Sequence, residues 1–188
     1  MKKLPPGRST AYNRDYGTCR RTCVVFSVLC GSMLVTEATN FLGIQPTDVA
    51  EKGKVVANSR GRIAPLNIWF IRSEGQVDSL DLRHHLDWLL DKIEPAASGI
   101  HQLQRLDGIV TRIMCIWESS VGHGGPTLWP EQMQRIANLN LELGFDIYFF
   151  GDDEDEPDSS GDPPVLVAPL SAGRQRLITP RSPKKTRV

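Results

Sequence analysis

Four apolar stretches alternate with amphipathic ones over the first 150 residues of the chain. The apolar stretches are rich in β-branched and aromatic residues, which is typical of strands covered on both faces. They predict strands at residues 23–30, 66–72, 109–117 and 145–150. The amphipathic stretches predict helices that begin near Met33, Leu80 and Pro130, with a looser helical stretch at residues 96–106. This order indicates an α+β domain with a four-stranded mixed or antiparallel sheet and three main helices.

The spacing of apolar residues within each helical stretch predicts its buried face. In the second helix this face consists of Leu82, Leu86, Leu89, Leu90 and Ile93. Asp78 or Ser79 is expected to cap the start of that helix. In the first helix the face consists of Leu34, Ala38, Phe41 and Leu42. Gly43 is expected in the left-handed conformation after it, and Met133 and Ile136 are expected to face the core from the last helix.

Composition divides the chain into three parts. Residues 1–17 are rich in Pro, Gly and polar residues without a period, and are predicted to form a flexible leader. Residues 18–150 hold all the predicted elements and form one α+β domain, because 188 residues give room for one ordinary core. Residues 151–188 are acidic and Pro-rich at first and basic at the end, and are predicted to be a disordered tail.

The charge balance narrows the classes of partner. The chain has 22 Lys and Arg against 22 Asp and Glu, so no net field attracts nucleic acid or an anionic membrane. The apolar run at residues 22–35 has the look of a secretory signal, but it is too short to span a bilayer and no clean cleavage site follows it. We interpret it as a buried strand that leads into a helix, with an export signal as the alternative. A cytoplasmic protein whose four cysteines are reduced thiols is therefore expected.

Three segments of the chain carry a resemblance to a known family. They are FLGIQPTDVAEKG at residues 41–53, LDLRHHLDWLLDKIEP at residues 80–95 and WPEQMQRIANLNLELGFDIYFF at residues 129–150. Together they resemble the bacterial domain-of-unknown-function family 4279 over residues 22–150. The family is largely uncharacterised, and small domains of this kind are suspected of neutralising toxins or binding other proteins. The resemblance thus implies a protein-binding role by analogy, and it does not cover the leader or the tail.

His85, Glu118 and His123 are the candidate residues for catalysis. Imidazole is the usual acid–base group near neutral pH, and Glu118 and His123 flank two serines in the loop predicted after the third strand. The alternative for His85 is a hydrogen-bonded packing role, because it lies at the edge of the apolar stripe. No metal and no cofactor are expected, since the cysteines lack zinc-site spacing and the adjacent His84 and His85 point about 100° apart on a helix.

A basic surface is the candidate for binding. Arg60, Arg62 and Arg72 are expected to lie beside exposed rings of Trp69 or Trp129, as sites for anions or nucleic acids require. No recognition motif accompanies these residues and acidic residues lie close in sequence, so a solvated loop is the alternative and nucleic acid is not an expected partner.

The leading hypothesis is a non-enzymatic protein-binding module with a protein partner, in one form an immunity-type protein that covers the partner's active site. It rests on the lack of a complete catalytic or cofactor motif in the sequence and on the long loops and charged tail. The alternative is a small hydrolase-like or ligand-binding enzyme in which His85, Glu118 and His123 share one cleft.

Overall fold

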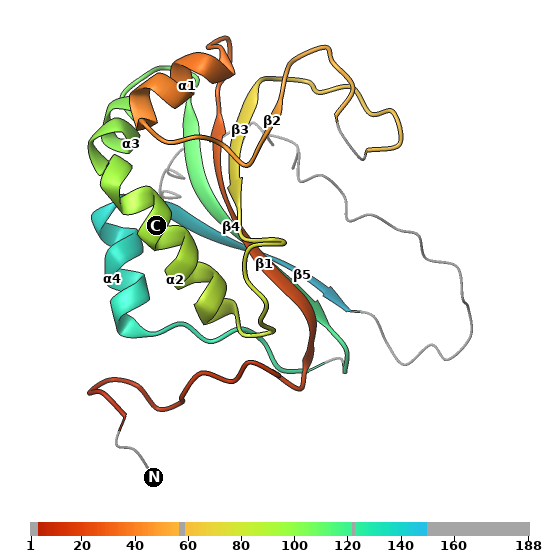
Figure 1. Ribbon diagram of the computed structural model, residues 1–188, viewed down its shortest axis with the longest axis vertical. Coiled ribbons are helices and arrows are strands. Elements are labelled where there is room, and N and C mark those ends of the chain that lie inside the picture. The colour runs from red at the N-terminus through yellow and green to blue at the C-terminus, as the bar shows by residue number, and fades with distance from the viewer. Residues whose placement is uncertain (1–3, 57–58, 122, 150–188) are drawn as a thin grey trace, which may run out of the picture.

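A five-stranded sheet in the order β2-β3-β1-β4-β5 forms the centre of the molecule (Figure 1). The computed structural model describes residues 4–56, 59–121 and 123–149, so the predicted tail lies outside the described residues. The strands are β1 Cys19–Leu29, β2 Asp48–Ala50, β3 Ile68–Arg72, β4 Val110–Ser119 and β5 Glu142–Phe149. β1 pairs antiparallel with β3 and β4, β2 pairs antiparallel with β3, and β4 and β5 are parallel. The sheet is therefore mixed.

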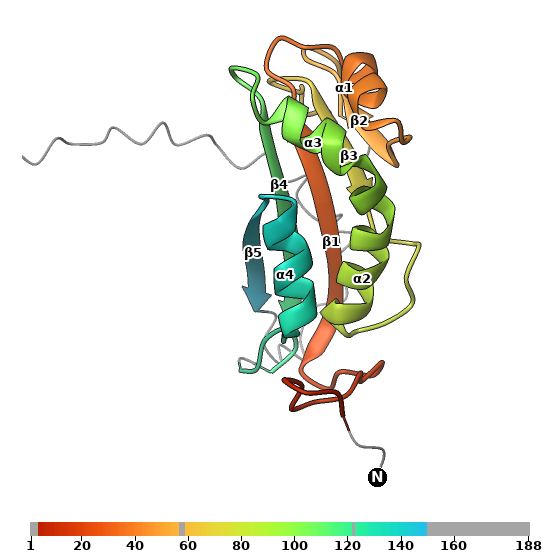
Figure 2. The ribbon, with the colours of Figure 1, turned by 90° about the vertical axis from the view of Figure 1, so that its left-hand side faces the viewer.

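Helices cover one face of this sheet (Figures 1 and 2). They are α1 Val35–Leu42, α2 Leu82–Ile93, α3 Ala97–Leu103 and α4 Pro130–Asn138, and a 3-10 turn at Glu94–Ala96 joins α2 to α3. α4 connects β4 to β5, because a parallel pair needs a crossover that returns the chain to the same end of the sheet. The predicted α+β class and the three helical connections between the predicted strands are confirmed.

Apolar side chains fill both faces of the sheet. Phe26, Trp69 and Trp117 lie between the sheet and the helices and are fully buried. All five residues of the predicted α2 face are also fully buried there. On the opposite face, Val25 and Phe70 pack with side chains of the connection at residues 51–67. The central strands therefore need apolar residues at every position, which explains their continuous apolar runs.

Several local predictions are wrong. β2, a fifth strand, was not predicted, because its three residues lie in a stretch that reads as an irregular connection. Phe41 and Met133 are 38% and 51% exposed and do not face the core. On α4 the inward position is taken by Gln132, which is 1% exposed and donates hydrogen bonds from Nε2 to the Arg83 carbonyl at 2.9 Å and to Asp87 at 2.8 Å.

The ends of the first two helices follow simple capping chemistry. Gly43 has φ of 66°, as predicted, and its N–H donates to the Thr39 carbonyl at 2.8 Å. The cap of α2 is Asp81 rather than Asp78 or Ser79, since the Asp81 carboxylate accepts the Arg83 N–H at 3.1 Å. Asp81 is a buried carboxylate, and it is the centre of the candidate site described below.

Candidate functional site

The three residues predicted for catalysis lie in separate surroundings. His85 is on α2 and is only 2% exposed, whereas His123 is exposed in the loop after β4. Trp117 points into the core beneath the helices, so its neighbour Glu118 points to the opposite face of the sheet. No hydrogen bond joins any two of the three within the described part of the chain. The structure thus leaves them without a common cleft.

His85 has both ring nitrogens engaged. Nε2 lies 2.8 Å from the Ser79 carbonyl, which can only accept, so Nε2 carries the proton. Nδ1 lies 2.7 Å from the Ser73 hydroxyl, and that oxygen also accepts the Val24 N–H at 2.9 Å. The hydroxyl therefore donates to Nδ1. Burial lowers the pKa of His85 below its usual value, and the ring acts as a neutral connector between β1, β3 and the start of α2.

Glu118 takes part in an arginine–carboxylate cluster. Nη1 of Arg21 donates to Glu118 at 2.5 Å, and Nη2 of the same side chain donates to Glu74. The cluster borders a pocket of about 470 Å³ whose wall also includes Arg14 and His85. Because two carboxylates already neutralise Arg21 and both nitrogens of His85 are bonded, neither residue offers a free group to a substrate.

The rings predicted to form an exposed binding platform are buried, so that part of the prediction is wrong. Trp69 is fully buried and its Nε1 donates to the Thr39 hydroxyl at 3.0 Å. Trp129 is 3% exposed. Trp129 lies just before the predicted helix at Pro130, where a sequence pattern does not show which neighbours cover a ring. Trp69 lies in the middle of the predicted strand at residues 66–72, whose apolar run already indicates burial.

The three predicted basic residues lie in two different surroundings. Arg60 and Arg62 are exposed in the connection at residues 51–67. Arg72 is half-buried, and its guanidinium carbon lies 4.6 Å from the centroid of the Phe70 ring.

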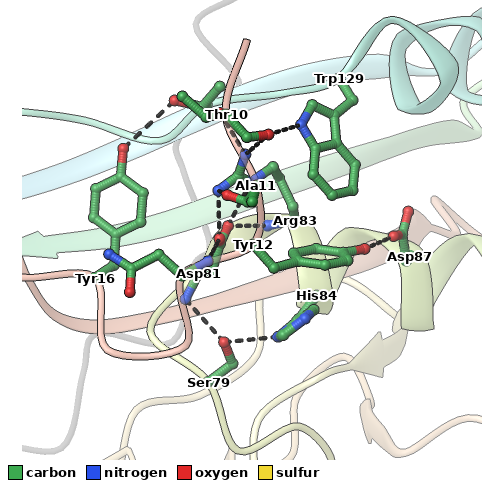
Figure 3. A network of polar contacts seen from close by, with 12 residues as sticks. Thr10, Ala11, Tyr12, Tyr16, Ser79, Asp81, Arg83, His84, Asp87 and Trp129 are labelled. Carbon is green, nitrogen blue, oxygen red and sulfur yellow. Dashed lines mark hydrogen bonds and ion pairs between the residues drawn. The ribbon is translucent and has the colours of Figure 1, made fainter. Parts of the chain in front are cut away.

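A buried ion pair at the start of α2 holds the N-terminal segment (Figure 3). Asp81 and Arg83 both have side chains that are 1% exposed, and they meet at 2.5 Å and 2.8 Å. The remaining guanidinium donors reach the Thr10 hydroxyl and the Ala11 carbonyl, each at 2.7 Å. In return, the Asp81 carboxylate accepts the Asn13 N–H at 2.8 Å. The segment predicted to be a flexible leader completes this pair.

The pair binds the segment largely through its main chain. The bound main-chain groups are the carbonyls of Thr10, Ala11 and Arg14 and the N–H of Asn13. Their partners are Trp129 Nε1, Arg83 Nη2, the Leu80 N–H and the Asp81 carboxylate. Such contacts recognise backbone groups rather than a particular sequence of side chains. We call Asp81, Arg83 and Trp129 the clamp.

One side chain of the segment is held as specifically as its backbone. The Tyr12 ring lies between His84 and Trp129, with ring centroids 3.9 Å and 4.3 Å away, and its hydroxyl donates to Asp87. The Arg8 guanidinium lies over the Trp129 ring, with its central carbon 3.6 Å from the ring centroid. An aromatic residue at this place adds selectivity to the backbone contacts.

Charge in the clamp is fixed by its hydrogen bonds. Burial by itself would raise the pKa of Asp81, but hydrogen bonds from Arg83 and from the Asn13 N–H outweigh it and lower the pKa below the usual value. The Asp81 carboxylate in turn raises the pKa of Arg83. Both groups are therefore ionised at neutral pH, and removing the N-terminal segment would leave donors and acceptors of a buried pair unmatched.

In the described part of the chain, potential metal ligands do not cluster and the thiols are buried. No group of three or more His, Cys, Asp or Glu is arranged there to hold a metal ion. The four cysteines are buried free thiols, and burial raises the pKa of Cys23 and of Cys30 to about 11. None of the described helices is both long and apolar enough to cross a bilayer.

Comparison with known proteins places the fold in a family. Residues 19–150 match the family described as a domain of unknown function (DUF4279). The chain belongs to this family. Searches of the curated proteins and of the solved structures give no match. The DUF4279 match includes the clamp and begins after the segment that the clamp holds.

The sequence analysis missed the clamp, although a signal was present. Arg83 is seven residues before Leu90, which is fully buried, so the helical period places both on one face. A charged residue on a buried face requires a partner, and Asp81 is two residues away. The occupant of the clamp could not be found in this way, because its backbone makes most of the contacts.

Proposed function

We propose that the chain is a non-enzymatic protein-binding module whose clamp binds a peptide segment. The observation that supports this is the destination of the Arg83 donors. A fully buried arginine, already paired with Asp81, directs its remaining hydrogen bonds to residues 10 and 11, which lie outside the matched DUF4279 region. Within the matched region, the clamp is thus occupied by a stretch of chain from outside that region.

The contacts of the clamp indicate which chemical groups a partner must supply. A competing segment must present backbone carbonyls at the positions of Thr10 and Ala11, which accept hydrogen bonds, and a backbone N–H at the position of Asn13, which donates one. It must also carry an aromatic side chain at the position of Tyr12, because that ring fills the space between His84 and Trp129. In the chain as it stands, residues 8–16 are the resident ligand, and a partner segment binds by taking their place.

The immunity-type role is a narrower form of this proposal. It requires that the partner be an enzyme or toxin and that binding cover its active site. The hydrolase-like alternative has less to support it, because His85 is closed off from solvent and bonded at both nitrogens.

The test converts the resident segment into a separable ligand. A specific protease sequence inserted after Gly17 in the full chain is cut after folding, so that residues 1–17 remain bound without a covalent link. Fluorescence anisotropy then follows exchange of the cut segment for a labelled synthetic peptide of residues 1–17. We expect saturable one-to-one binding, and a scrambled peptide of the same composition should not compete.

Backbone reading is tested by single N-methyl groups on the synthetic peptide. Methylation of the Asn13 amide removes its hydrogen bond to Asp81, so the affinity should fall by about tenfold or more, as for other hydrogen bonds to charged groups. Methylation of the Asp15 amide is the matched control, because that amide donates no hydrogen bond among the described residues. Equal losses for the two peptides, or binding no stronger than that of the scrambled peptide, would refute the proposal.

Partner capture extends the same design. The cut domain, freed of its segment and immobilised, is exposed to an extract of its own cells, and bound proteins are eluted with the peptide of residues 1–17. A stoichiometric protein released by this peptide but not by the N-methyl-Asn13 form identifies a partner of the clamp. If that protein is an enzyme, an activity assay with and without the domain tests the immunity-type role.

A further inference from the structure

The free edge of the sheet at β5 is apolar over its second half. β5 has a neighbour on one side only, the parallel strand β4. Every second residue of such a strand turns its N–H and C=O away from the sheet, where no strand among the described residues pairs with them. An exposed, unpaired strand is a site for the addition of another strand.

The side chains along this edge strengthen the case. Leu143 is in register with the buried Ile113, so it lies on the face that the helices cover, and it packs against the core there. Further along the same face Phe145, Ile147 and Phe149 are 43%, 59% and 59% exposed. Three large apolar residues in a row on an open edge are a liability that folded proteins normally cover.

We propose that residues 165–170 of the same chain, VLVAPL, add to β5 as an antiparallel sixth strand. They form a short apolar run of β-forming residues in an otherwise charged C-terminal region. Alternate residues of such a strand face the two sides of the sheet, so Val165 and Val167 pack together on one side. Pro164 precedes the strand and Pro169 is its second-to-last residue, and prolines near the ends of a short edge strand discourage further pairing.

Chain length favours this occupant over a separate molecule. Residues 150–164 connect the end of β5 to Val165. A random coil of that length has a root-mean-square span of about 20 Å, which exceeds the roughly 5 Å between neighbouring strands, so the connection is long enough. The tethered segment therefore meets the edge at an effective concentration on the order of millimolar.

Charge also favours this occupant over a second copy of the chain. β5 carries the acidic residues Glu142 and Asp146, so two copies that pair through this edge bring like charges together. The segment 165–170 has no charged residue, and Arg174 and Arg176 follow it. In an antiparallel arrangement these two arginines continue toward the start of β5, where Glu142 lies. The inference does not depend on the proposed function, because the clamp is at the start of α2.

Amide hydrogen exchange in the full-length protein, followed residue by residue by NMR, tests the inference. In the double variant Val165→Asp/Val167→Asp, the added strand is disrupted and the domain itself is unchanged. The matched control Ser159→Asp/Ser160→Asp places the same two charges in the connection. We expect the outward-facing amides of β5 to be protected in the wild type and in the control, and to exchange at least about tenfold faster in the valine variant.

Three results would overturn the inference. The first is that the outward-facing amides of β5 exchange as fast in the wild type as in an open strand. The second is that they are equally protected in the valine variant. The third is that the control substitutions change their exchange rates as much as the valine substitutions do. Protection that persists in the valine variant and rises with protein concentration would assign the edge to a second copy instead.

Discussion

Buried polar residues at the junction of α2 with the sheet are the side chains whose behaviour is most tightly specified by the fold. His85 is neutral there, and its Nδ1 accepts a hydrogen bond from Ser73 while its Nε2 donates to the Ser79 carbonyl. A second proton on the ring would occupy Nδ1, so the Ser73 hydroxyl could no longer donate to it and would have to accept from both Nδ1 and the Val24 N–H. The lowered pKa of His85 therefore has a direct consequence for stability.

Acid should destabilise the protein through this residue. The unfolded chain takes up a proton on His85 near its ordinary pKa of 6.5, whereas the folded chain resists it, so the stabilisation is complete above about pH 6.5 and is lost as the pH falls through the folded value. The slope for one such group is at most about 1.4 kcal/mol per pH unit. Urea unfolding between about pH 5 and about pH 7.5 should show this slope in the wild type and a flatter profile in His85→Gln.

The control for this experiment is His101→Gln, a substitution on α3 away from the Ser73 and Ser79 contacts. It should retain the slope of the wild type. Parallel pH profiles for the wild type and His85→Gln would contradict the role given to His85.

Close contact between helices is the feature that matters at the scale of elements. α1 and α3 approach so closely that a Cβ atom on Gly99 would lie 2.0 Å from the Phe41 carbonyl oxygen. The contact involves backbone atoms, which cannot turn aside as a flexible side chain does. The absence of a side chain at residue 99 therefore sets the distance between the two helices.

Gly99→Ala should lower the free energy of unfolding by about 1–3 kcal/mol, the usual range for an overpacked core. This loss should appear although alanine favours the helical conformation more than glycine does. Gly17→Ala is the control, because nothing lies within 4 Å of a Cβ atom at that position. Chemical denaturation of the two variants gives the comparison, and a Gly99→Ala protein as stable as the Gly17→Ala protein would contradict the contact.

The elements that the sequence predicted correctly are those whose pattern is set by burial. The α2 face follows from apolar spacing alone, because all five of its positions lie against the core. The central strands follow from apolar runs that are buried over most of their length. β2 could not be predicted, since a three-residue strand on an edge is defined by its pairing with β3 and not by its own composition. The prediction for Met133 failed because the neighbouring Gln132 takes the buried position in this turn of α4, where it satisfies buried polar groups.

At the scale of the whole molecule, the joining of distant segments decides where the candidate site lies. The clamp combines the start of α2, the start of α4 and residues 8–16 of the N-terminal segment. A pattern along the chain shows that Arg83 needs a partner, but it does not show which distant backbone supplies it. The predicted trio of His85, Glu118 and His123 fails for the same reason. Their side chains suit catalysis by type, but residue type does not show which residues meet in the fold.

The four buried cysteines can serve as natural reporters of how this molecule opens. The thiolate is the form that reacts with alkylating reagents, and burial both covers each sulfur and raises its pKa. Each thiol is therefore modified only when its part of the sheet opens, at a rate that measures the local free energy of opening. Cys19 begins β1 beside the N-terminal segment, whereas Cys115 lies in the middle of β4 beneath the helices.

Mass spectrometry of pulse-labelled protein should thus find Cys19 modified well before Cys115, and earlier modification of Cys115 would contradict this order. Cutting the chain after Gly17 should speed the labelling of Cys19 much more than that of Cys115. The native thiols in and next to the two central strands therefore report local opening through their modification rates, and no probe has to be introduced.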